Sequence, residues 1–143
     1  MLFASKIIFT CLCLFTIGMN SGFGLNKTHA TNPLWPPHAR FHFASEFMNV
    51  TFVQCAALFL VWGNYPGKGS ELATWVTGLA VITFWGTFIP ASLWPGARPW
   101  IDGKPVPKYL PPVFKRYAPP LRISAAVCLI AGFGIWLDIN SRK

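Results

Sequence analysis

Charged residues are scarce in this sequence. They make up 11% of its 143 residues, and only four are acidic, whereas an average soluble protein has roughly 25% charged residues. Hydrophobic residues make up 53%. A soluble domain of this length could not bury so much apolar surface in one core. The composition therefore excludes an ordinary soluble domain and favours a single membrane domain, residues 1–143, with the lipid bilayer as its solvent.

Motifs that use cysteine for metal binding are also lacking. The cysteines, Cys11, Cys13, Cys55 and Cys128, form no CxxC pair and no Cys/His zinc pattern. All four lie inside apolar runs, so we interpret them as small hydrophobic residues. The formal net charge of +8 does not indicate nucleic acid as a partner, because the basic residues gather in the connections between apolar runs.

Four apolar stretches approach the ~20 residues that cross a bilayer as a helix. They cover about residues 2–23, 41–62, 72–93 and 121–139. We therefore predict an all-α fold, an integral membrane four-helix bundle. The first stretch has an alternative interpretation as a cleaved signal peptide, because Lys6 precedes its apolar core and small residues follow it.

The connection between the third and fourth stretches is rich in proline. Residues 90–120 hold nine of the thirteen prolines of the chain, with Trp94, Trp100, Tyr109 and Tyr117 between them. Proline cannot continue a helix and stiffens the chain toward extended forms, and aromatic residues suit the headgroup region. We predict a Pro-rich surface loop over residues 94–120, with a plain linker as the alternative.

The basic residues predict an orientation in the membrane. Eight of the twelve lysines and arginines lie in the connections that follow the first and third stretches. Positive charge is enriched in cytoplasmic loops, so we expect both of these loops in the cytoplasm. One feature points the other way: Asn26-Lys27-Thr28 is a glycosylation sequon, which is used only in a secretory lumen.

A polar stripe is predicted at the start of the second helix. Pro36 and Pro37 suit the first turn of a helix, and at ~100° per residue several polar positions then share one ~100° sector. These residues are His38, His42, Ser45, Glu46 and Asn49. Lipid does not tolerate such groups on a membrane helix. We therefore expect the stripe to face the interior of the bundle, near the cytoplasmic interface.

The first functional hypothesis is an enzyme that acts on a lipophilic small molecule by acid–base chemistry, of the isomerase, cyclase or oxygenase type. The candidate catalytic residues are His38, His42, Glu46 and Asn49, and the candidate substrate-binding residues are Asn32, Trp35 and Arg40. His42 and Glu46 would exchange the proton, because imidazole and carboxylate are common general acids and bases. Arg40 would bind an anionic group and Trp35 would close the mouth of the site.

Two alternatives remain open. In one, the protein is a non-enzymatic membrane subunit or scaffold, whose stripe holds the bundle together or contacts a second copy or another membrane partner. In the other, His38 and His42 bind a metal, since they have the i, i+4 spacing of helical zinc sites. Glu46 lies ~12 Å from His38 along the helix axis, so a further ligand would be His29 or Asp102. No other cofactor is predicted.

The segment Asn32–His42 reads N-P-L-W-P-P-H-A-R-F-H. It resembles the signature of a family of small four-helix membrane proteins of unknown function, found in fungi and bacteria. The resemblance implies one helix before the signature and three after it, over most of the chain. Many relatives continue after the second histidine with polar residues such as Asn-Gly-Gln, whereas this chain has Phe43-Ala44-Ser45 and then Glu46.

Overall fold

The computed structural model describes residues 1–25, 30–91, 93, 95 and 119–143. Its elements are α1 (Phe3–Gly24), α2 (Pro37–Trp62), α3 (Lys68–Gly86), the short α4 (Phe88–Ala91) and α6 (Pro119–Asn140). The described residues contain no strand, which confirms the all-α prediction. Four of these segments are long and apolar enough to cross a membrane. Most of the predicted Pro-rich loop, 94–120, lies outside the described residues.

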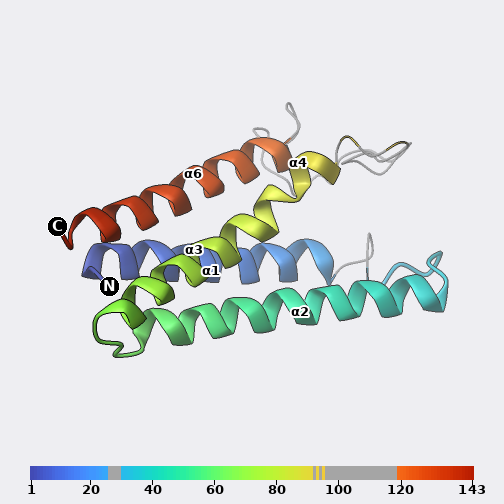
Figure 1. Cartoon of the computed structure of the whole chain (residues 1–143). Coiled ribbons are helices and arrows are strands. Elements are labelled where there is room, and N and C mark those ends of the chain that lie inside the picture. Colours follow the sequence, from blue (N-terminus) through green and yellow to red (C-terminus); the bar gives the residue numbers. More distant parts are fainter. Residues whose placement is uncertain (26–29, 92, 94, 96–118) are drawn as a thin grey trace.

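The four long helices form a closed bundle. α1 packs against α2, α2 against α3, α3 against α6, and α6 against α1. Both chain ends and the connection between α2 and α3 lie at one end of the bundle (Figure 1). The end of α1, the start of α2 and the start of α6 lie at the other end, where the first turns of α2 extend past α1 (Figure 1). The predicted four-helix bundle is confirmed.

Proline and glycine set the helix boundaries that the apolar runs place only approximately. α2 begins four residues earlier than expected, because Pro36 is the extended N-cap and Pro37 takes the first helical position. α3 begins after Gly67, whose φ of 54° favours glycine. The long helix ends at Gly86, four residues before Pro90, where the proline ring would clash with the carbonyl group. α4 continues the span to Ala91.

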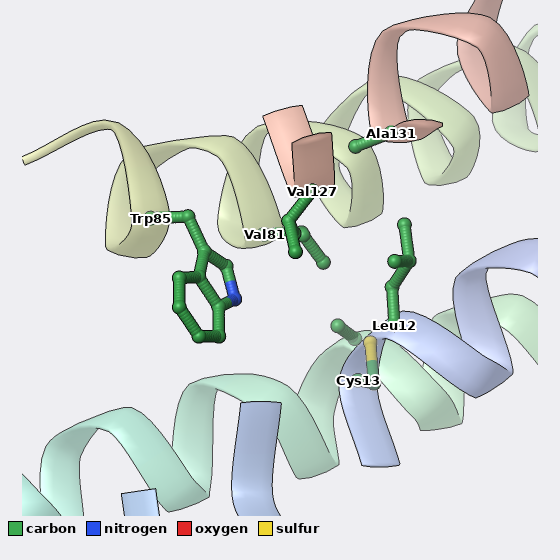
Figure 2. Packing of buried hydrophobic residues seen from close by; sticks show 7 residues of the cluster. Leu12, Cys13, Val81, Trp85, Val127 and Ala131 are labelled. Atoms are coloured by element: carbon green, nitrogen blue, oxygen red, sulfur yellow. The ribbon is translucent and has the colours of Figure 1, made fainter. Parts of the chain in front are cut away.

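The core is a layer of small and aromatic side chains between the helices. Its residues are Leu12, Cys13, Ala57, Val81, Trp85, Val127 and Ala131, most of which are labelled in Figure 2. The indole Nε1 of Trp85 donates a hydrogen bond to Thr16 Oγ1 at 2.9 Å, so the polar atom of the largest core residue is satisfied. α1 supplies two members of this layer and is an integral wall of the bundle.

Candidate functional site

The turn before α2 is held by side chains of the Asn32–His42 segment. Asn32 Oδ1 accepts a hydrogen bond from the backbone N–H of Leu34 at 2.9 Å, the pattern of an Asx turn. Arg40 then reaches back from α2 to the same turn. Its Nε donates to the carbonyl oxygen of Trp35 at 3.1 Å, and its Nη2 donates to that of Pro33 at 3.3 Å. Asn32 and Arg40, both expected to bind substrate, therefore shape the backbone here.

The third expected substrate-binding residue, Trp35, connects the turn to the bundle. Its ring meets the ring of Phe43 edge-on, with 6.0 Å between the centroids. Phe43 in turn lies against Gly24 at the end of α1, where an added Cβ would come within 2.6 Å of the phenyl ring. Phe43 thus occupies space that any larger residue at position 24 would take. This stack fixes the direction in which α2 leaves the turn.

The polar stripe of α2 lies on the outside of the bundle. The exposed residues are His38, His42, Ser45, Glu46 and Asn49. The prediction that the stripe faces the interior is therefore wrong. Within the described ranges, the side chains of Ser45, Glu46 and Asn49 have no hydrogen-bond partner. No described residue therefore competes with an outside molecule for these polar groups.

The physical reason is that α2 packs through a seam next to the stripe that is apolar apart from Gln54. The seam consists of Phe43, Phe47, Val50, Gln54, Ala57 and Val61, which are half-buried or buried. Their spacing alternates between four and three residues, as in helices that pack nearly parallel. In the first half of α2 each seam residue follows a stripe residue directly, for example Phe47 after Glu46. The stripe is therefore rotated by ~100° from the seam.

An exposed apolar edge lies on the other side of the stripe. Phe41, Met48, Phe52 and Phe59 are exposed by 66%, 46%, 64% and 75%. At ~100° per residue these four positions fall within a sector of about 40°. The outer surface of α2 is thus polar in its first half, and large apolar side chains run beside the stripe and continue beyond it.

His38 and His42 are in direct contact on this surface. Their Nε2 atoms are 3.0 Å apart, and the rings meet edge-on with centroids 4.4 Å apart. The ring of Phe41 lies edge-on to His42 at 5.8 Å. The described ranges contain no group of three or more residues that could hold a metal ion. His29 and Asp102, the further ligands considered from the sequence, lie outside those ranges.

A second polar cluster, at the opposite end of the bundle, was missed by the sequence analysis. Asp138 of α6 is fully buried, and its carboxylate accepts hydrogen bonds from Thr74 Oγ1 at 2.6 Å and from Arg142 Nε at 3.1 Å. The backbone N–H of Leu2 also donates to it. Arg142 Nη2 donates to Ser70 Oγ at 2.9 Å. This ion-paired cluster joins α1, α3 and α6.

The sequence did contain a signal for this cluster. Asp138 is the only acidic residue in the fourth apolar run, and Arg142 follows it by four residues, the spacing of an ion pair on one helix face. Because the carboxylate is paired and hydrogen-bonded from several sides, the cluster is a structural clamp. The apolar depression lined by Leu60, Tyr65, Gly69, Leu72, Ala73 and Val76 contains none of the candidate site residues.

Four apolar helices closed into a bundle, with an ion-paired clamp at one end, define a multi-pass membrane protein. The chain belongs to the Family of unknown function (DUF6640), whose model matches residues 16–119. The match includes the Asn32–His42 segment and the stripe, and it confirms the resemblance to a family of unknown function. No curated protein and no solved structure matches the chain.

Proposed function

We propose that this protein binds a lipophilic molecule from the membrane on the outer face of α2. The polar head of that molecule contacts His42, Glu46 and Asn49, and its apolar body lies along Phe52 and Phe59. One observation carries the proposal: exposed polar side chains, without hydrogen-bond partners among the described residues, share one surface of α2 with large exposed apolar side chains. An amphiphilic ligand satisfies both.

The length of α2 supports this placement. Its 26 residues extend ~39 Å, about 9 Å more than the ~30 Å hydrocarbon core. If the apolar end at Trp62 lies at one interface, His42 lies at the opposite boundary of the core and His38 beyond it. Glu46 then lies about 6 Å and Asn49 about 10 Å inside the core. An unsatisfied polar group there is costly. A bound polar head removes that cost.

Acid–base chemistry on the bound molecule is the finer part of this proposal. His42 and Glu46 are four residues apart on one helix face, and the contact between the histidine Nε2 atoms offers a path for a proton to His38. A substrate would enter sideways from the bilayer. Isomerisation and cyclisation of lipophilic molecules are reactions that such a site suits, because both proceed by proton transfer alone. Asn32, Trp35 and Arg40 then act as positioning residues, because they hold the turn that carries the stripe.

The second candidate is a non-enzymatic membrane subunit. It is favoured by the extent of the exposed surface: Phe41 and Phe59 are 18 residues apart in the sequence, ~27 Å along the helix axis. Another membrane helix with polar side chains could cover such a surface. The same experiment distinguishes the two candidates.

The test is mass spectrometry of the intact protein, purified in mild detergent, with bound small molecules and copurifying proteins measured together. The variants are Glu46→Gln and His42→Ala. Glu71→Gln is the matched control, because Glu71 is exposed in the first turn of α3, away from the stripe. We expect a lipophilic adduct on the wild type and on Glu71→Gln, and at least a fivefold lower occupancy in Glu46→Gln.

Equal occupancy in all four proteins would contradict the proposal. A protein without an adduct that copurifies with a membrane protein, and loses it in Glu46→Gln, would establish the subunit instead. For the finer proposal, the bound molecule is incubated with wild type and Glu46→Gln. Product formation by the wild type alone is expected, and no product from either protein would limit the function to binding.

A further inference from the structure

We infer that His38 and His42 form a bidentate site for a divalent transition-metal ion, with the Nε2 atoms of both rings bound to the same ion. This inference goes beyond the proposed function and does not depend on it. Its basis is the direct contact between the two rings at the start of α2.

The separation of the two nitrogen atoms suits a metal ion. Nε2 of His38 and Nε2 of His42 are 3.0 Å apart, and zinc–nitrogen bonds are ~2.0–2.1 Å long. If both nitrogen atoms bind one ion at this separation, the nitrogen–metal–nitrogen angle is roughly 95°. That value lies near the right angle between neighbouring ligands in square-planar and octahedral coordination. In the metal-free protein the two Nε2 atoms share a hydrogen bond, whose direction depends on the tautomers of the rings. A bound ion takes the place of the shared proton, and both rings then carry their proton on Nδ1.

The charged side chains of this part of α2 are Arg40 and Glu46. Arg40 is between the two histidines in the sequence, but it lies on another side of the helix, and its guanidinium is bound to the carbonyl oxygens of Pro33 and Trp35. Glu46 lies one turn beyond His42 and carries no ion pair within the described ranges. Its negative charge offsets the positive charge of Arg40, so these two side chains together place no net positive charge beside the ion.

The exposure of the site determines its character. Both histidines are exposed, so an ion enters from the solvent or headgroup region without any rearrangement. No third ligating side chain joins them among the described residues. The remaining positions on the ion are therefore open to water or to oxygen atoms of a bound polar head. An open site of this kind exchanges its metal, unlike a closed structural zinc site.

The experiment is a titration of the full-length protein with Cu²⁺ alone, followed by electron paramagnetic resonance. Cu²⁺ is the sensitive probe because it binds nitrogen sites more tightly than the other divalent first-row ions. The protein is purified through a tag without histidine and kept free of added lipophilic ligand. We expect one Cu²⁺ per chain with two nitrogen ligands, displaced by excess Zn²⁺.

The variants locate the site. We expect His38→Ala and His42→Ala each to weaken Cu²⁺ binding at least tenfold and to leave one nitrogen ligand in the spectrum. His29→Ala, the remaining histidine of the chain, should bind Cu²⁺ within twofold of the wild type. Unchanged melting temperatures of the metal-free variants show that the fold is retained.

Two results would overturn the inference. One is a double variant, His38→Ala with His42→Ala, that binds Cu²⁺ as tightly as the wild type. The other is a loss in His29→Ala as large as that in His42→Ala, which would make the pair alone insufficient. These results do not bear on the proposed function. That function is tested separately, by the occupancy of the lipophilic adduct on Glu46→Gln without added metal.

Discussion

At the scale of single residues, the Asn32–His42 segment divides into two groups. Asn32, Trp35 and Arg40 are engaged in the turn through hydrogen bonds and ring contacts. His38 and His42 contact one another and are otherwise open to the outside. A segment that combines both groups builds a rigid turn and presents imidazole side chains from it. The two groups should therefore respond differently to substitution.

Arg40→Ala should destabilise the protein by about 1–2 kcal/mol, because it removes two charge-assisted hydrogen bonds from a partly solvated turn. Arg40→Lys is the matched control for charge. Lysine cannot span two carbonyl oxygens with a fixed planar group, so it should recover less than half of the loss. Thermal unfolding in detergent measures both variants. Full recovery by lysine would show that charge, and not the two hydrogen bonds, holds the turn.

Asp138→Asn should lower the free energy of unfolding by about 3 kcal/mol, more than Arg40→Ala does. Removing one partner of a buried ion pair leaves the other charge uncompensated. Thr74→Ala removes only one of the hydrogen bonds to the carboxylate and should cost about 1 kcal/mol. The yield of folded protein and its melting temperature report both changes. Asp138→Asn with wild-type stability would contradict the structural role of this cluster.

At the scale of the helices, periodicity identified which residues of α2 share a face. It did not identify which face is inside. The argument that lipid repels polar groups placed the stripe inward, whereas the seam of Phe43, Phe47 and Val50 packs against the bundle. A sequence gives the angle between two faces of a helix, but the inner face depends on the neighbours. Here the neighbouring helices cover the seam and leave the stripe exposed.

The contact between α3 and α6 gives an element-scale prediction. Gly78 lies so close to α6 that an added Cβ would come within 2.5 Å of Ile135, whereas Gly132 has open space around it. Gly78→Val should therefore destabilise the bundle by about 1–3 kcal/mol through overpacking. Gly132→Val is the control and should change stability by less than about 1 kcal/mol, as expected for an exchange without a packing clash. Equal melting temperatures for both variants would contradict the packing of α3 on α6.

At the scale of the whole molecule, the number of helices and the class of protein followed from the sequence. Runs of ~20 apolar residues are the strongest pattern a sequence carries, and each run became one helix of the bundle. The spacing of Asp138 and Arg142 indicates their ion pair, but it does not indicate the partners Ser70 and Thr74, which lie far away in the sequence. Long-range contacts of this kind need the packed structure.

The orientation of the protein in the membrane is a prediction that concerns the whole molecule. Positive charge places the connection before α2 in the cytoplasm, and the connection between α2 and α3 lies at the opposite end of the bundle (Figure 1). Cysteines introduced at the exposed residues Asn64 and Thr31 test this. In intact cells an impermeant thiol reagent should label Asn64→Cys and spare Thr31→Cys until the membrane is opened. The reverse labelling pattern would show that the protein has the opposite orientation in the membrane.

In the proposed function, the α2 stripe faces outward and contacts a lipophilic molecule. A photo-crosslinking amino acid at Asn49, irradiated in the native membrane and analysed by intact mass, tests it most directly. The same amino acid at Ala57, which is buried in the seam, is the control. We expect a small lipophilic adduct at position 49 and crosslinks only within the chain at position 57. Crosslinks only within the chain at both positions would contradict it.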